Sequence, residues 1–223
     1  MSLQHVTFRA IQRSDKEQMI ALHKEFFPVP YSMNYYDKLV EGIGMFNDPL
    51  YSVIAVNDQG DIVGFIFAQL LRYPDQCEDQ NLFTHPEPAT VCYILTLGCT
   101  QEYRRLGLGS TLLDHIKTYA LSTGSCGCVY LHVIHYNTAA IQFYTKNQFE
   151  QIRYMDDFYF IEQKYFAAYL YVFYLPSYQP SLWHQWYKGF RYGYGYEYMG
   201  MWVYWYLVCD MCNMYEPYTP IKR

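Results

Sequence analysis

The sequence predicts an α/β fold with a mixed sheet of about seven strands and about four helices. Three observations lead to this prediction. Apolar strand patterns recur through residues 4–175, helical apolar stripes separate them, and the turn Asn57-Asp58-Gln59-Gly60-Asp61 joins two strands as a hairpin. In chain order we expect a strand, two helices, three strands, a helix, a strand, a helix and two strands.

The first elements follow from local signals. Residues 4–11 alternate between apolar and polar side chains, as a half-buried strand does. Ser14 and Glu17 have capping-box spacing and predict a helix over about 15–25, which prolines then prevent from continuing. The stretch 73–88 is polar and contains three prolines, so we expect a surface loop. The other elements expected before residue 90 are a helix at about 34–45 and strands at 51–56 and 62–71.

The stretch from Val91 to Ser110 begins as an apolar strand and breaks into a basic turn that contains glycines. An amphipathic helix, Ser110 to Tyr119, follows directly. Backbone N–H groups converge at such a turn, and the helix dipole favours negative charge there. The stretch therefore predicts a site for a pyrophosphate group. The remaining predicted elements are a strand at 128–134, a short helix with Asn137 as its N-cap, and strands at 154–161 and 165–175.

Composition restricts the class of protein. The 223 residues carry a formal net charge of -5, so the chain lacks the overall positive charge that is typical of nucleic-acid-binding proteins. The start of the chain lacks the apolar core of a secretory signal, and no run approaches the ~20 apolar residues of a spanning helix. Seven cysteines suit a reducing, cytosol-facing chain with free thiols. Cys209-Asp210-Met211-Cys212 is half of a zinc motif with no second half, so we expect no metal.

The segment Arg104-Arg105-Leu106-Gly107-Leu108-Gly109 fits the Arg/Gln-x-x-Gly-x-Gly/Ala signature of GCN5-related N-acetyltransferases (GNAT). It follows a predicted strand and opens a helix, as the mechanism of that motif requires. Residues 91–98, 130–133 and 137–144 further resemble NatF-type N-alpha-acetyltransferases, which are membrane-associated. The resemblance covers roughly residues 4–175. It implies that 1–175 form one GNAT domain, with that family's mixed, mostly antiparallel seven-stranded sheet flanked by about four helices. The composition shifts after Leu175, and Pro176 and Pro180 mark a linker, which predicts that 176–223 are a separate aromatic-rich tail.

The resemblance implies acetyl transfer from acetyl-CoA to the α-amine of protein N-termini. Expected substrates start with Met followed by a hydrophobic residue or Lys, on membrane proteins with cytosolic N-termini. The family's catalytic positions match Tyr93 and His132. An α-amine has a pKa of ~8 and an ordinary histidine ~6.5, so a histidine can take the proton directly or through water. Tyr93 would relay the proton or donate one to the leaving thiolate.

The resemblance also implies the binding residues. The cofactor positions are Leu97, Gly98, Cys99, Arg104, Arg105, Leu106, Gly107, Leu108, Gly109, Ser110, Asn137 and Tyr144. The substrate positions are Phe27, Pro28, Tyr31, Leu95 and Tyr159. For Tyr144, packing in the core is the alternative role. Phe158 departs from the tyrosine pair that this family places in its last hairpin, because it offers no hydroxyl group.

The tail has two interpretations. All four tryptophans lie in it, and residues 199–209 are too short to span a bilayer but suit its headgroup interface. This pattern predicts peripheral attachment to the cytosolic face of a membrane, such as the Golgi or plasma membrane, and otherwise a cytoplasmic protein. The alternative is a tail packed on its own domain or on a partner. The protein is expected to be a monomer or a weak homodimer.

Two other functions remain open. One is acetylation of lysine, as in histones, or of a small amine. Such enzymes commonly use an acidic base on the fourth strand, and Tyr93 to Leu97 supplies none. The other is a non-catalytic acyl-CoA-binding module, which Tyr93 and His132 argue against.

Overall fold

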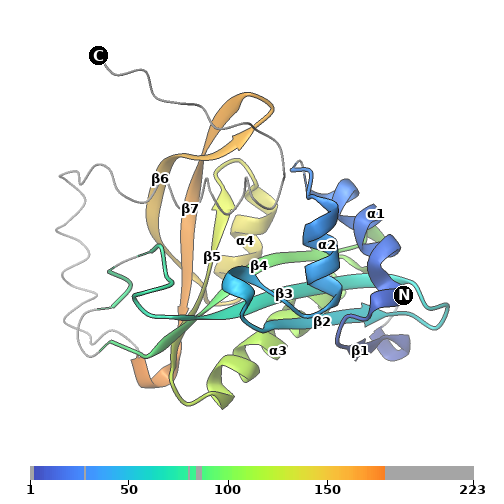
Figure 1. Cartoon of the computed structure of the whole chain (residues 1–223), viewed down its shortest axis with the longest axis horizontal. Coiled ribbons are helices and arrows are strands. Elements are labelled where there is room, and N and C mark those ends of the chain that lie inside the picture. Colours follow the sequence, from blue (N-terminus) through green and yellow to red (C-terminus); the bar gives the residue numbers. More distant parts are fainter. Residues whose placement is uncertain (1–2, 28, 80, 84–86, 179–223) are drawn as a thin grey trace.

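A computed structural model describes residues 3–27, 29–79, 81–83 and 87–178 of the chain. These residues form a seven-stranded sheet in the order β1-β2-β3-β4-β5-β7-β6, antiparallel except between β4 and β5. The order of helices and strands confirms the predicted α/β sheet (Figure 1). The strands are β1 (Thr7–Arg9), β2 (Leu50–Val56), β3 (Ile62–Arg72), β4 (Thr90–Cys99), β5 (Cys126–Ile134), β6 (Glu150–Ile161) and β7 (Lys164–Tyr174).

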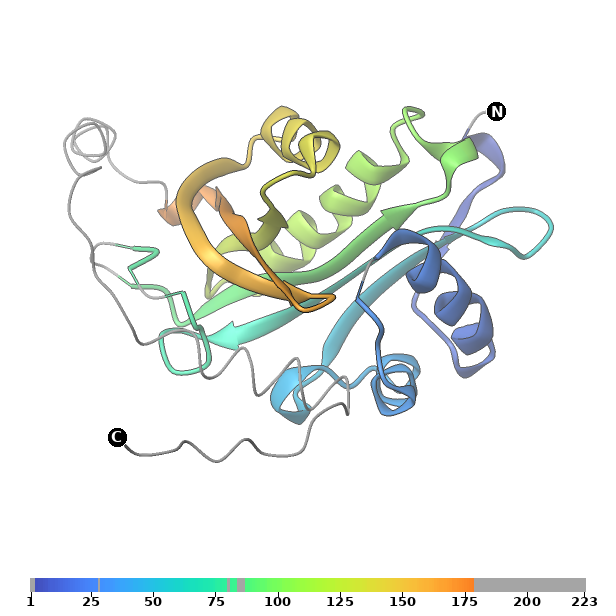
Figure 2. The ribbon, with the colours of Figure 1, turned by 90° about the horizontal axis from the view of Figure 1, so that it is seen from above.

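Four α-helices cover the two faces of the sheet: α1 (Lys16–Phe26), α2 (Met33–Val40), α3 (Leu108–Ser122) and α4 (Thr138–Lys146). Figure 2 shows α1 and α2 on one side and α3 and α4 on the other. The predicted stripe of α3 packs into the core, where Leu112, Leu113 and Ile116 are fully buried. On the opposite face, α1 and α2 close over Phe65 and Phe67 of β3.

The parallel strands β4 and β5 separate part-way along their length. Their last paired residues are Tyr93 and Tyr130. Beyond this pair, no β4–β5 pairing occurs among the described residues, although β4 runs on to Cys99 and β5 to Ile134. Leu95 is an extra residue in β4, because Thr96 pairs with Phe67 while Ile94 pairs with Ala68, the next residue of β3. The result is a fork, formed by residues 94–99 and 131–134 (Figure 1).

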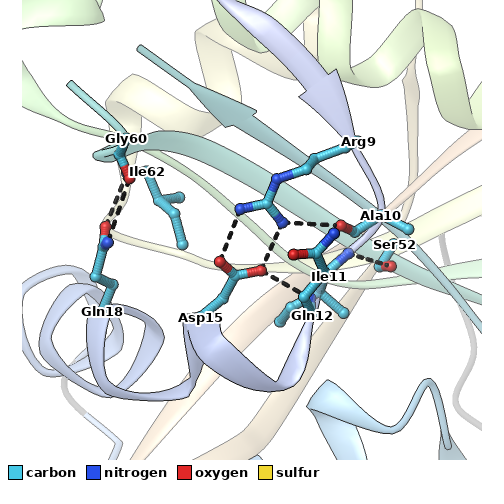
Figure 3. Close-up of polar contacts among 9 residues, drawn as sticks. All are labelled: Arg9, Ala10, Ile11, Gln12, Asp15, Gln18, Ser52, Gly60 and Ile62. Atoms are coloured by element: carbon cyan, nitrogen blue, oxygen red, sulfur yellow. Dashed lines mark hydrogen bonds and ion pairs between the residues drawn. The ribbon is translucent and has the colours of Figure 1, made fainter. Parts of the chain in front are cut away.

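The start of the chain differs from the prediction in its cap. The strand is limited to Thr7–Arg9, and Ser14 does not form the expected capping box. Instead Asp15 accepts two hydrogen bonds from the Arg9 guanidinium, at 2.7 and 2.8 Å, and one from the Gln12 N–H at 2.7 Å (Figure 3). A bidentate guanidinium contact is stronger than the hydroxyl cap we expected, so Asp15 and not Ser14 sets the entry to α1.

Several helix and strand boundaries also differ from the prediction. α2 ends at Val40 rather than near residue 45, and β6 begins at Glu150 rather than 154. α3 begins at Leu108, two residues earlier than predicted, so that the second glycine of the basic turn lies inside the helix. The tail from residue 179 onward, with its tryptophans and the Cys209–Cys212 segment, lies outside the described residues. In the part that is described, no helix has the length and apolar character needed to cross a bilayer.

The prediction of a polar surface loop at 73–88 is wrong. Tyr73, Cys77, Asp79 and Leu82 are buried, between 2 and 8% exposed. The Leu82 N–H donates to the Tyr73 hydroxyl at 3.2 Å, and its carbonyl oxygen accepts from Tyr174 of β7 at 2.9 Å. The connection between β3 and β4 is therefore fixed to the sheet beside the last β4–β5 pair, where it contributes to a candidate site.

Candidate active site

Tyr93 and His132 meet at the base of the fork. Tyr130 is the last β5 residue paired with β4, and His132, two residues on, points to the same face of the sheet. Its ring therefore lies beside the side chain of Tyr93, and the Tyr93 hydroxyl oxygen is 3.3 Å from His132 Nδ1. Tyr93 is 8% exposed and the His132 side chain 3%. The structure thus brings the two predicted catalytic residues into direct contact, in a nearly closed environment.

Asp79 approaches His132 from the other side. Its Oδ2 lies 3.0 Å from His132 Nε2, and Arg153 of β6 donates to its Oδ1 at 3.3 Å. Burial acts to raise the pKa of Asp79, but the charges of His132 and Arg153 outweigh it and leave that pKa below its ordinary value. An ionised carboxylate only accepts hydrogen bonds, so it favours a proton on Nε2. His132 Nδ1 then presents a lone pair to the Tyr93 hydroxyl.

Sequence analysis missed Asp79. It lies in the segment interpreted as a polar surface loop, yet it is only 2% exposed. The available signal was the run of apolar residues that interrupts this segment, at Tyr73, Cys77, Leu82 and Phe83. A loop that carries so many apolar side chains must pack against the domain, and acidic residues between them are then drawn into its interior.

The hairpin of β6 and β7 forms one wall of the site. Phe158 stacks on the His132 ring, with ring centroids 4.3 Å apart, and the Tyr159 hydroxyl donates to the His132 carbonyl oxygen at 3.4 Å. Phe158 therefore supports the imidazole through ring stacking, a role that needs no hydroxyl group. Tyr159 lies beside Phe158 in this hairpin, and its hydroxyl contacts the backbone of β5.

The segment between α1 and α2 supplies aromatic residues on the same face. Phe27 and Tyr31 both pack against His23 of α1, with centroid separations of 5.3 and 5.1 Å. Leu95 packs against this cluster and against the cluster that contains Tyr93, and so connects the two. Pro28, the fifth predicted substrate residue, lies outside the described residues.

The basic turn leads into the first turn of α3. Gly107 is the N-cap of this helix and adopts a left-handed conformation, with φ of 94°, that favours glycine. The N–H groups of Leu108, Gly109 and Ser110 lie in the first helical turn, where no partner exists within the helix. The Arg104 Nε donates to the Cys99 carbonyl oxygen at 3.1 Å, which ties the turn to the end of β4. Leu106 and Arg105 are exposed.

The predicted contacts along β4 lie on the edge of the fork. The backbone of Leu97, Gly98 and Cys99 pairs with β3 on one side. On the other side it pairs with no described residue of β5.

The predicted cofactor residues of α4 have structural roles. Asn137 caps α4 by accepting from the Ala140 N–H at 3.1 Å. Tyr144 is 8% exposed and packs in the core, where burial raises its pKa. The described residues include no group of three or more His, Cys, Asp or Glu side chains that could hold a metal ion.

Comparison with known proteins agrees with this geometry. Residues 16–149 match the model of the acetyltransferase (GNAT) family. The chain is 30% identical to N-alpha-acetyltransferase 60 of Danio rerio, over 80% of this chain and 74% of that protein. It is 29% identical to the histone acetyltransferase MCC1 of Arabidopsis thaliana, over 76% of this chain and 70% of that one.

Solved structures show the same likeness. The structure of Arabidopsis thaliana NAA60 with a bisubstrate analogue superposes with a TM-score of 0.69 at 30% identity, over 77% of this chain and 98% of that one. The same protein has been solved with acetyl-CoA, and that structure gives a TM-score of 0.67. The family match spans more than half of the chain and agrees in fold and in sequence. The protein therefore belongs to the GNAT family of acetyltransferases.

Proposed function

We propose that this enzyme transfers the acetyl group of acetyl-CoA to the α-amine of protein N-termini that begin with Met. The main support is the contact of Tyr93 with His132 at the base of the fork, backed by the buried carboxylate of Asp79. Family membership supports the cofactor, and the relatives named N-alpha-acetyltransferase 60 support the class of substrate.

The fork suits an extended acyl carrier. The β4 edge at Leu97 to Cys99 offers backbone groups to an amide-containing chain, and the first turn of α3 offers N–H groups and a dipole to a pyrophosphate. Gly107 leaves that turn without a side chain. When bound there, acetyl-CoA supplies the thioester carbonyl that an amine attacks. Asn137 and Tyr144 support this site from α4, Tyr144 through the packing of its ring.

Side chains of this protein carry out the proton transfers of the reaction. An α-amine with a pKa of ~8 is mostly protonated at neutral pH and must lose a proton before it can attack. His132 Nδ1 accepts that proton through the Tyr93 hydroxyl or a water molecule, and Asp79 stabilises the resulting imidazolium. Tyr93 is then placed to donate a proton to the departing thiolate.

The walls of the site favour an apolar first residue. Phe27, Tyr31 and Leu95 would line the entrance on one side, and Tyr159 on the other. A peptide panel tests this specificity: peptides beginning Met-Leu and Met-Lys, the same peptides with blocked N-termini, and an internal-lysine peptide, each with acetyl-CoA and mass-spectrometric detection. Acetylation of the free Met peptides alone supports the proposal. Acetylation restricted to internal lysine would refute it.

Lysine acetylation is the second candidate, favoured by the likeness to a protein named histone acetyltransferase. The same panel addresses it, because the blocked peptides retain lysine side chains as their only amines. Modification of both free N-termini and internal lysines would indicate that one site serves both amines.

For the tail we propose attachment to the cytosolic face of the Golgi or plasma membrane. The support is the sequence alone, namely the Trp and Tyr content of residues 176–223. Co-sedimentation with liposomes, comparing the full chain with a chain ending at residue 178, should show binding only for the full chain. Equal binding by both chains would remove the proposal.

We expect the protein to be a monomer or a weak homodimer in solution. Analytical sedimentation can measure this oligomeric state.

A further inference from the structure

Glu78, next to Asp79 in the connection between β3 and β4, has an unusual environment. Its Oε1 is buried, with less than 1 Å² exposed, and has no hydrogen-bond partner among the described residues. The residue as a whole keeps partial exposure to solvent. A buried carboxylate oxygen without a partner costs free energy, and the cost is larger when the group is charged. Such an atom at a catalytic centre needs an explanation.

Glu78 also lines a cavity together with the proposed catalytic residues. This cavity of about 20 Å³ is lined by Glu78, Asp79, Tyr93, Tyr130 and His132, and by Met45, Phe46, Leu71 and Gln76. A site of at least about 10–15 Å³ with two to four polar partners can hold one water molecule. Most of the cavity surface is apolar, but its volume is enough for a single water molecule between Glu78 and the catalytic residues.

The apolar side of the cavity is held in place by β3. Met45 and Phe46 belong to a 3-10 turn, Met45–Asn47, between α2 and β2. The buried Gln69 of β3 accepts from the Met45 N–H and donates to the Met45 carbonyl oxygen, both at 2.6 Å. This double hydrogen bond holds the turn beside the cavity.

The two neighbouring carboxyl groups have opposite electrostatic surroundings. Asp79 is paired with His132 and Arg153 and stays charged. Burial, and then the charge of Asp79, raise the pKa of Glu78 to about 7. Among the described residues, the other titratable side chains at this cavity are Asp79, Tyr93, Tyr130 and His132, and Cys77 lies close enough to interact with Glu78; none of them is a fixed cation. Adjacent carboxyl groups whose pKa values are driven apart are a common division of acid–base roles.

The reaction supplies a proton that must leave this site. An ammonium and a thioester become an amide, a thiol and one proton: the C–N bond forms, the C–S bond breaks, and nitrogen loses two protons. One proton goes to the thiolate sulfur. The other, taken first by the Tyr93–His132 pair, has to reach solvent before the next turnover. His132 must lose that proton before it can accept the next one.

We propose that Glu78 receives this second proton through a water molecule in the shared cavity and passes it to solvent. The step moves a proton from imidazolium, by way of the Tyr93 hydroxyl and the water, to the Glu78 carboxylate. His132 and Tyr93 return to their starting states, and no bond other than O–H and N–H changes. The inference rests on the proposed N-terminal acetyltransferase function.

The test compares the full-length chain with E78Q and with D75N, which removes an exposed carboxylate from the same loop. Steady-state rates are measured with acetyl-CoA and a Met-Leu peptide at pH 6–9 in weak buffer. We expect kcat of E78Q to fall about tenfold, less than the 10²–10⁴ of direct general-base catalysis, with KM unchanged. Added imidazole, a small soluble proton acceptor, should restore the rate. D75N should match the wild type.

The outcomes are distinguishable. A wild type inactive on every N-terminal peptide overturns the proposed function. An active wild type with E78Q equal to D75N, or an E78Q defect that imidazole leaves unchanged, overturns the role of Glu78 alone. Infrared difference spectra give a second measurement that needs no turnover: a carboxylic-acid carbonyl band should titrate near pH 7 in the wild type and be absent in E78Q. A wild type without that band also overturns the inference.

Discussion

The Asp79 carboxylate lies 3.0 Å from Nε2 of His132, and both side chains are only 3% exposed. This contact orients the imidazole that we propose receives the substrate proton, and the carboxylate comes from a loop rather than from the sheet. Arg153 holds the other carboxylate oxygen, so the aspartate stays ionised in spite of its burial. Three elements far apart in the chain therefore combine to fix one histidine tautomer.

Substitution D79N should lower kcat about 10²-fold, because the amide keeps the shape of the carboxylate but loses the charge that stabilises imidazolium. The KM for peptide and the affinity for acetyl-CoA should change little. Steady-state kinetics with a Met-Leu peptide measures the effect, and D156N, an exposed acid on β6, is the matched control. A D79N enzyme with wild-type kcat would show that the contact is not needed for turnover.

The Tyr93 hydroxyl and His132 Nδ1 should behave as one unit. Y93F and H132Q should each lower kcat by roughly 10²-fold or more, and the double variant should lose little beyond the worse single variant. The reason is that removing either partner of the 3.3 Å contact already interrupts the proton path. Losses that multiply in the double variant would mean that the two residues act independently.

Part of this site could be predicted from sequence. The residues that were predicted differ from the one that was missed in the kind of structure on which they lie. Tyr93 and His132 were predicted from the resemblance of their strands to NatF-type enzymes, because alternation within a strand does not show which other strand lies beside it. Asp79 lies in a loop without periodicity, and its burial depends on long-range contacts such as Leu82 with Tyr174. The fork could not be derived from the strand patterns alone, because pairing between strands leaves no mark on the apolar pattern of either strand.

Gly107 should matter for cofactor binding more than for stability. Its φ of 94° is unfavourable for alanine, so G107A should cost about 1–2 kcal/mol in unfolding free energy. Gly124, at φ 68°, supplies the matched control, because an added Cβ meets no atom within 4 Å at either glycine. Both variants should lose similar stability, but only G107A should weaken acetyl-CoA binding, about tenfold by calorimetry. Equal affinities in the two variants would contradict a pyrophosphate site at α3.

His23 should make the stability of the fold depend on pH. It is 1% exposed, and neither ring nitrogen has a hydrogen-bond partner among the described residues. Six aromatic rings surround it: Phe27, Tyr31, Tyr35, Tyr36, Phe65 and Phe67. Burial lowers the pKa of His23 from 6.5 to about 4. The unfolded chain therefore binds this proton more readily than the folded protein does.

The sign of the effect follows from that difference. Stability is full above pH 6.5 and falls as the pH drops toward 4, by about 3 kcal/mol in total, since one pKa unit is worth about 1.4 kcal/mol. Asp15 and Asp79 have lowered pKa values, so their contributions are lost only below about pH 3.8, outside this window. Glu78, whose pKa burial raises to about 7, acts in the opposite direction within it, because the folded protein binds that proton more readily than the unfolded chain. The comparison is therefore made in E78Q. Denaturant unfolding between pH 7.5 and 4.5 should show the slope in E78Q and in E78Q/H5Q, which alters an exposed histidine. E78Q/H23L should flatten it, and a slope that persists there would assign the proton uptake to another group.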